Sequence, residues 1–125
     1  MSRGSFDKLC GFELVSAAEG KARMRVVVGE ALANPNGHLH GGAIATLVDV
    51  AGTYAIMSAD RQGRPGVTTD LNVSYLVGAP VGAAVVAEAS VLKIGKTLAF
   101  VEVDVRREAD GALMAQGRMT KFQGG

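Results

Sequence analysis

The stretch Gly41–Ala59, GGAIATLVDVAGTYAIMSA, decides the fold. Apolar residues recur along it at helical spacing, at Ile44, Leu47, Val48, Ala51, Tyr54 and Ala55. The opposite side of this predicted helix is also largely apolar, so we expect the helix to be buried on most of its sides. Its single charge, Asp49, lies near the middle, where an acidic residue costs about 2.5–3.5 kcal/mol in a bilayer. We therefore expect a helix inside a folded domain and no membrane span.

Segments that alternate polar and apolar residues surround this helix and predict strands. In Lys21–Val28, basic side chains alternate with apolar ones, which is typical of a strand with one buried face. The expected strands are Phe12–Ala17, Lys21–Val28, Val67–Val77, Ala84–Ile94, Thr97–Arg107 and Ala112–Thr120. Short connections favour antiparallel neighbours, and Ser5–Cys10 is expected to form a short helical turn. The pattern predicts an α+β fold in which an antiparallel sheet of about six strands wraps around one long central helix.

Length and composition narrow the class of protein. The 125 residues suit one domain spanning 1–125, and a hydrophobic content of 48% excludes a disordered chain. With 13 basic and 12 acidic side chains the net charge is +1, so we expect no nucleic-acid partner. Cys10 is the only cysteine in the sequence and cannot form an internal disulfide. The chain begins without an apolar leader, and we expect a cytoplasmic protein.

The residues before the helix form a loop, Asn34-Pro35-Asn36-Gly37, that leads through His40 into Gly41 and Gly42. The two glycines remove side chains from the first helical turn, where free N–H groups meet the positive end of the helix dipole. Such groups bind an oxygen that develops negative charge, which is the requirement of an oxyanion hole. An equally good interpretation is a tight helix entry against a neighbouring strand.

Asp49 is the second unusual residue of this region. An acid on an apolar helix loses hydration, and carboxylates in such places serve as general bases or nucleophiles. Asp49 could also lie on a solvent-facing stripe of the helix, or pair with a structural arginine. The residue types alone leave these alternatives open.

The spacing of the two features has a consequence for assembly. His40 and Asp49 are nine residues apart, or roughly 13 Å along a helix, so one chain cannot bring both to one reacting carbon. If both belong to one site, two chains must share it, with their helices side by side and antiparallel about a two-fold axis. The high apolar content of so small a chain also indicates a surface for partners.

These residues belong to a set of motifs that runs from about Asn34 to Lys121. The set comprises His40-Gly41-Gly42, Ala45–Asp49, Pro65-Gly66-Val67, Asp70-Leu71-Asn72, Tyr75, Val91-Leu92-Lys93, Gly95–Phe100 and Ala115–Arg118. In these motifs the chain resembles the hotdog-fold acyl-CoA thioesterases of the phenylacetate-degradation type. It is similar to the branch that contains the mammalian mitochondria-associated acyl-CoA thioesterase.

The resemblance implies a role for each matching residue. Gly41 would donate its N–H to the thioester carbonyl, His40 would orient the site, and Asn34 would position the thioester or the attacking water. Asp49, contributed by the partner subunit, would act as general base or as nucleophile. Thr68 stands where the family has a serine that helps to hold the water. The substrate and CoA contacts implied in this way are Gly42, Tyr75, Lys93, Gly95 and Lys96.

The activity implied is hydrolysis of an acyl-CoA to a free acid and CoA, without cofactor or metal. His38, His40 and Asp49 are not expected to form a metal site, because roughly 13 Å of helix separates the histidines from Asp49. The resemblance also implies a homodimer that shares its sites, and a homotetramer built from such dimers. The alternatives are a hotdog-fold acyl-thioester dehydratase or hydratase and a non-catalytic acyl-CoA-binding protein. The sequence does not identify which acyl group is hydrolysed.

Overall fold

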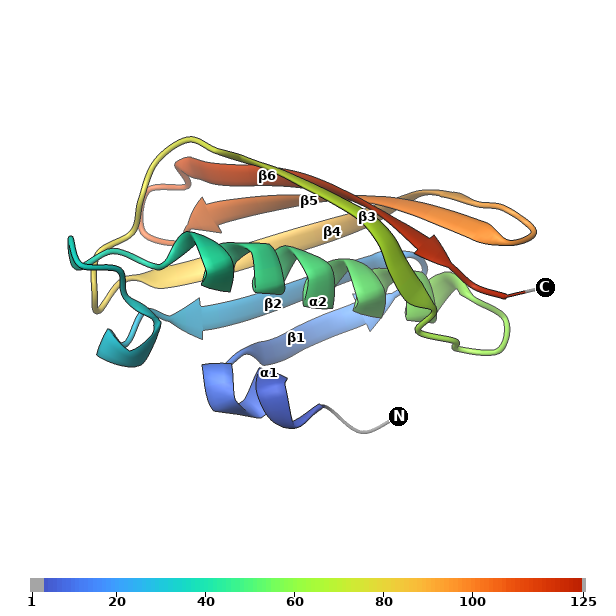
Figure 1. The fold of residues 1–125 in the computed structure, drawn as a ribbon, viewed down its shortest axis with the longest axis horizontal. Helices are drawn as coiled ribbons and strands as arrows, with labels where there is room; N and C mark the ends of the chain where they lie inside the picture. The colour runs from blue at the N-terminus through green and yellow to red at the C-terminus, as the bar shows by residue number, and fades with distance from the viewer. Residues whose placement is uncertain (1–3, 125) are drawn as a thin grey trace.

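One antiparallel sheet curves around one long helix in the computed structural model, which describes residues 4–124 (Figure 1). The helical segments are α1 (Ser5–Cys10), the 3₁₀ turn η1 (Glu30–Leu32) and α2 (Gly41–Ala59). The strands are β1 (Glu13–Ala18), β2 (Lys21–Val27), β3 (Val67–Tyr75), β4 (Ala84–Ile94), β5 (Leu98–Arg107) and β6 (Leu113–Phe122). The α+β architecture and the predicted bounds of the long helix are confirmed.

The strands lie in the order β1-β2-β4-β5-β6-β3, and every neighbouring pair is antiparallel. The expectation that short connections join neighbouring strands is wrong for β3 and β4. Residues 76–83 connect these two strands, yet β3 lies at the edge of the sheet and β4 near its centre. Since β2 and β5 already pair with both edges of β4, β3 pairs instead with the free edge of β6.

The inner face of the sheet packs against α2 and forms the core (Figure 1). The buried residues of α2 are Ile44, Leu47, Val48, Ala51, Gly52, Ala55 and Ile56. Glycines let the helix approach the strands closely, because a Cβ on Gly117 of β6 would lie 2.6 Å from Val48 Cγ1. By length and composition alone α2 could cross a membrane, but here it lies against the sheet.

The other face of α2 is only partly covered in the single chain. Ala45, Val50, Tyr54 and Met57 are half-buried, so the expected burial on most sides is wrong for one copy. The physical reason is that the sheet curves around one side of the helix. The edge strand β3 also exposes apolar side chains, at Val67, Leu71 and Tyr75. The single chain therefore leaves apolar surface on both the helix and the edge strand.

A hydrogen-bonded loop leads from α2 to β3. The Asp60 carboxylate accepts the backbone N–H groups of Gln62 and Arg64 at 3.0 and 2.9 Å, and the Arg64 guanidinium at 3.0 and 3.2 Å. These bonds from Arg64 lower the pKa of Asp60 well below its usual range. Arg64 also donates to the carbonyl of Gln123 at 3.1 Å, which ties the loop to the chain just beyond β6. The start of β3, which includes Thr68, is held by these contacts.

Gly117→Ala should lower the free energy of unfolding by about 1–3 kcal/mol, because the added methyl group meets the stiff β-branched side chain of Val48. Gly52→Ala is the matched control. It should cost less, because the atom nearest the new Cβ is the flexible end of Met119, which can move away, whereas the stiff neighbour Val101 Cγ1 lies at 3.0 Å rather than 2.6 Å. Chemical denaturation measures both changes. Adding Val48→Ala to the Gly117→Ala chain should recover part of the loss, and a purely additive effect would contradict this packing.

Asp60→Asn should lower the melting temperature at neutral pH. Since the pKa of Asp60 is lowered in the folded chain, its charge stabilises the fold above about pH 4, and this stabilisation fades as the pH falls further. The difference in melting temperature from the wild type should therefore shrink between about pH 6 and about pH 3. Asp110→Asn is the control, because Asp110 pairs with Arg107 on an exposed turn, where ion pairs contribute little. A pH-independent difference for Asp60→Asn would contradict the assignment.

Candidate active site

His40 caps the N-terminus of α2. Its Nδ1 accepts the backbone N–H of Gly42 at 2.8 Å, so the neutral imidazole carries its proton on Nε2. A Cβ on Gly42 would lie 3.0 Å from that nitrogen, which explains the value of glycine here. Because the Gly42 N–H is used by the cap, the first turn presents the Gly41 N–H, which has no acceptor among the described residues.

Asn34 and Tyr75 border a cavity of about 310 Å³ together with Gly41. The Asn34 side-chain oxygen accepts the backbone N–H groups of Asn36 and His38 at 3.0 and 3.1 Å. The amide nitrogen of Asn34 is therefore the part of this side chain that remains to bind a ligand, and it can only donate. The Tyr75 hydroxyl donates to the carbonyl of Gly41 at 2.9 Å and so anchors the first turn of α2 to β3.

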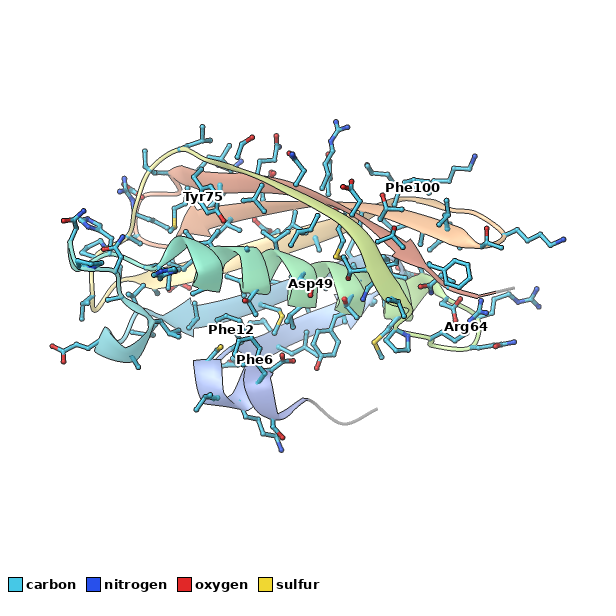
Figure 2. All side chains as sticks on the ribbon, in the orientation of Figure 1. Phe6, Phe12, Asp49, Arg64, Tyr75 and Phe100 are labelled. Carbon is cyan, nitrogen blue, oxygen red and sulfur yellow. The ribbon has the colours of Figure 1, made fainter. Side chains whose placement is uncertain are left out.

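Asp49 lies half-buried in the middle of α2, beside β3 (Figure 2). Thr68 of β3 donates its hydroxyl proton to Asp49 Oδ1 at 2.8 Å, which holds the carboxylate in one orientation. No arginine forms an ion pair with Asp49 within residues 4–124, and Asp49 lies on the partly covered face of α2 beside Val50 and Tyr54. Asp49 also borders a cavity of about 150 Å³, and Asp7 of α1 lines the same cavity.

The β4–β5 hairpin lies at the opposite end of α2 from Gly41. Ile94 and Gly95 line a cavity of about 520 Å³ with Ala59 and Arg61. Lys93 and Lys96 flank this turn and are exposed. Gly95 is required by the backbone itself, because a Cβ there would lie 2.9 Å from the carbonyl oxygen of Leu98.

The sequence-predicted residues thus form three groups in one chain. Asn34, His40, Gly41, Gly42 and Tyr75 gather at the N-terminus of α2, Asp49 and Thr68 lie at its middle, and Lys93, Gly95 and Lys96 lie beyond its C-terminus. Figure 2 shows the offset between Tyr75 and Asp49 along the helix. With roughly 13 Å of helix between its first two groups, one copy does not assemble the predicted site.

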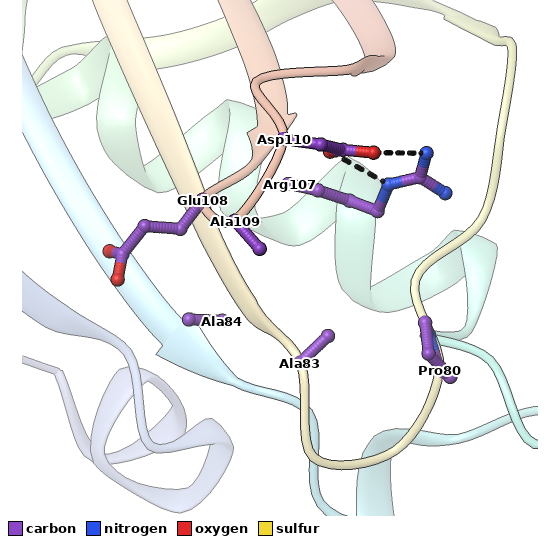
Figure 3. A pocket seen from close by; sticks show the side chains of 7 residues that line it. All are labelled: Pro80, Ala83, Ala84, Arg107, Glu108, Ala109 and Asp110. Carbon is purple, nitrogen blue, oxygen red and sulfur yellow. Dashed lines mark hydrogen bonds and ion pairs between the residues drawn. The ribbon is translucent and has the colours of Figure 1, made fainter.

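The cavity in Figure 3, of about 420 Å³, contains neither Asp49 nor Gly41. The charged residues that line it already have partners within the protein. Arg107 donates to Asp110 and to the carbonyl of Gly78, and Glu108 forms an ion pair with Arg25. These groups are satisfied without a ligand, so we assign no site to this cavity. Within residues 4–124, no cluster of three or more His, Cys, Asp or Glu side chains could hold a metal.

Lys121 is the residue near Asp49 that the sequence reasoning missed. The expected last strand ended at Thr120, whereas β6 continues through Lys121 to Phe122. Lys121 is only 6% exposed, and burial lowers its pKa while the charge of Asp49 opposes that shift. The signal was present in the alternation of β6, where Lys121 follows Gly117 and Met119 on the inner face.

Residues 36–114 match the model of the thioesterase superfamily. Human acyl-coenzyme A thioesterase 13 is 47% identical over 121 residues, which cover 96% of this chain and 86% of the relative. The crystal structure of zebrafish thioesterase superfamily member 2 superposes with a TM-score of 0.90 at 46% identity, covering 98% of this chain and 88% of that one. The Escherichia coli PaaI protein of the phenylacetic acid degradation operon shares the fold, with a TM-score of 0.90 at 24% identity over 98% and 86% of the two chains.

The fold, the motif at the start of α2 and these likenesses define a hotdog-fold thioester hydrolase. The chain belongs to the thioesterase superfamily. In this reaction one water is consumed and the carbon–sulfur bond breaks: the acyl group leaves as the acid, and the departing thiolate takes up the proton that the water loses. Charge develops on the carbonyl oxygen, so a pre-oriented N–H group and a nearby carboxylate are the groups that this chemistry needs.

Thr68→Val removes the hydroxyl that holds Asp49 while keeping the shape of the side chain. A hydrogen bond to a charged group contributes about 1.5–3 kcal/mol, so we expect kcat to fall about 10-fold to 100-fold. Thr68→Ser is the matched control and should retain most of the activity, because its hydroxyl can make the same bond. Release of free thiol from an acyl-CoA measures both variants. Equal activities of the valine and serine variants would show that this hydroxyl has no part in the reaction.

Proposed function

We propose that the chain hydrolyses acyl-CoA thioesters to a free acid and CoA, at sites that two copies of the chain build together. The observation that carries this proposal is the separation of the Gly41 N–H from the Asp49 carboxylate along one rigid helix. Hydrolysis requires both groups at one carbonyl carbon. The 47% identity to human acyl-coenzyme A thioesterase 13 supports the substrate class. A Streptococcus mutans protein solved bound to acetyl CoA, 25% identical with a TM-score of 0.83 over 91% of this chain and 89% of that one, supports a CoA site on this fold.

The thioester carbonyl binds at the N-terminus of α2. Its oxygen accepts the Gly41 N–H at the positive end of the helix dipole, where developing negative charge is stabilised. His40 accepts the Gly42 N–H, which leaves the Gly41 N–H as the free donor of the first turn. Tyr75 donates to the Gly41 carbonyl and so fixes the position of that residue. Asn34 adds a donor from its amide nitrogen, which suits a carbonyl or water oxygen or the departing sulfur.

Asp49 of the second copy completes the site. As a general base it takes a proton from the water that attacks the carbonyl carbon; as a nucleophile it attacks that carbon itself, and water then hydrolyses the resulting anhydride. Thr68 serves either route, because its proton is directed at Asp49 and its lone pairs can accept from a water. In both routes the carbon–sulfur bond breaks and CoA leaves.

The coenzyme portion lies toward the β4–β5 hairpin of the copy that supplies Asp49. Lys93 and Lys96 are exposed there, and their ammonium groups suit the phosphates of CoA. Gly95 shapes the turn that carries them. This placement is consistent with two antiparallel helices, since the N-terminus of one α2 then faces the middle and the C-terminal end of the other.

The assembly proposed is a homodimer, with two dimers paired into a homotetramer. The half-buried face of α2 and the unpaired edge of β3 supply the apolar surface for the dimer. Leu92, Leu98 and Phe122 are also exposed and support a second contact.

Two inactive variants mixed together should recover activity. Asp49→Asn removes the base or nucleophile, and Asn34→Asp removes the amide donor but keeps the oxygen that shapes the loop. A mixed dimer has one site with both original residues and one with neither. After unfolding and refolding an equal mixture, half of the dimers are mixed and each has one of two sites, so about a quarter of the wild-type rate is expected.

Thiol release measures this recovery, and refolding each variant alone is the control. If Asp49→Asn alone retains the wild-type rate, Asp49 has no catalytic role. If both variants are inactive and the mixture stays at their sum, although sedimentation shows dimers, each site lies within one chain.

A further inference from the structure

A cavity of about 370 Å³ lies between α1, the turn η1 and the first turns of α2. Phe6 and Leu9 of α1, together with Leu32 of η1, give it apolar walls. Thr46 of α2 also borders it, but the Thr46 hydroxyl donates to the carbonyl of Gly42 at 2.8 Å and is thereby satisfied within the helix. None of the described residues that border the cavity carries a charge, so its chemistry suits an apolar ligand.

The side chains of α1 divide between the core and this cavity. Cys10 and Phe12, at and just beyond the end of α1, are buried in the core and anchor the helix. Phe6 and Leu9 border the cavity instead and are 58% and 82% exposed in the single chain. A ligand that covers them removes apolar surface from water, which is favourable.

The cavity begins where the thioester carbonyl binds in the proposed site. Gly42 borders the cavity, and Gly41, which supplies the free N–H group, is the preceding residue, with its Cα about 3.8 Å away. The wall formed by η1 is fixed to the same place, because the N–H of His40 donates to the carbonyl of Leu32 at 2.7 Å. A chain attached to a carbonyl carbon beside Gly41 therefore reaches this cavity with its first methylene groups.

Two other cavities border the candidate residues and suit a hydrocarbon chain less well. The cavity beside Asp49 has a volume of only about 150 Å³ and is bordered by a second carboxylate, Asp7, and carboxylates lose hydration when a hydrocarbon covers them. The cavity at Gly41 is bordered by Asn34 and Tyr75, whose polar groups suit the amide-bearing arm of the coenzyme. The cavity between α1 and α2 is the larger apolar space of the three.

We propose that the cavity between α1 and α2 binds the hydrocarbon chain of the acyl group, and that the substrates are straight-chain aliphatic acyl-CoAs of up to about ten to twelve carbons. This inference rests on the proposed function, in which the thioester carbonyl binds at Gly41. The length follows from the volume: at roughly 30 Å³ for each non-hydrogen atom, the share of a water molecule in the liquid, about 370 Å³ holds about twelve atoms.

A series of straight-chain acyl-CoAs from butanoyl-CoA to tetradecanoyl-CoA tests the proposal, with release of free thiol as the readout. For the wild type, kcat/KM should rise about 2-fold to 4-fold with each added methylene, because each one buries apolar surface. The rise should end near ten to twelve carbons, where the chain extends beyond the cavity.

Leu9→Ser makes one wall of the cavity polar and should flatten this rise. We expect the ratio of kcat/KM for decanoyl-CoA to that for butanoyl-CoA to fall about 10-fold. Lys8→Ser is the matched control, because Lys8 is the exposed neighbour on the same short helix and does not border the cavity. It should keep the wild-type ratio, since the loss of its charge affects all acyl-CoAs alike.

Thr46→Phe narrows the cavity from the side of α2. Its four additional non-hydrogen atoms occupy about 120 Å³, so the chain length with the highest kcat/KM should shorten by about four carbons. Met57→Phe is the control, because it places a ring at the cavity beside Asp49 on the same helix. The preferred chain length of this variant should match that of the wild type.

A wild-type kcat/KM that does not rise with chain length overturns the proposal, and so does a preferred length that shifts in Met57→Phe and not in Thr46→Phe. Should Thr46→Phe fail to fold, as its melting curve would show, Leu9→Ser decides the question, because Leu9 is exposed and its replacement leaves the core intact. If no acyl-CoA of the series releases thiol, the proposed function fails. Hydrolysis with an unchanged chain-length ratio in Leu9→Ser overturns only the acyl site.

Discussion

The packing of α2 against the inner face of the sheet is the interaction on which the rest of the structure depends. At Gly52 and Gly117 the helix and the strands lie so close together that an added methyl group would clash with the facing side chain. The helix can therefore neither rotate nor slide without losing its core contacts. A helix held in this way has a fixed first turn and a fixed middle. The N–H of Gly41 and the carboxylate of Asp49 are therefore rigidly separated on one chain, and the same rigidity fixes the direction in which each of them points.

The polar groups of the site are supported from strands that are distant in sequence and adjacent in space. Tyr75 at the end of β3 holds the carbonyl of Gly41, and Thr68 at its start holds Asp49. The loop that begins β3 is itself tied down by the Asp60–Arg64 pair. A single strand thus contacts both groups of candidate residues on α2, because it runs along the helix from its middle to its first turn.

Residue types and spacing predict much of the candidate site. A glycine pair after a polar loop predicts a helix N-terminus open to an oxygen ligand, and the acid on an apolar helix predicts Asp49 as a reactive group. Residue types and spacing do not predict which group donates and which accepts each hydrogen bond. Asn34 uses its oxygen within the loop and keeps its amide, and the N–H of Gly42 is used by His40, which leaves that of Gly41. These assignments depend on backbone positions that spacing alone does not define.

The local sequence pattern predicted the long helix, the number of strands, and the positions of the glycine pair and of Asp49 on α2. This is possible because helical and strand periodicity are properties of neighbouring residues. Tertiary structure decided that β3 lies beside β6 rather than β4, and that the last strand extends far enough to place Lys121 next to Thr68. Strand order and register depend on which edges are free once the helix has covered the sheet. Those are long-range contacts, and no window of the chain contains both of their partners.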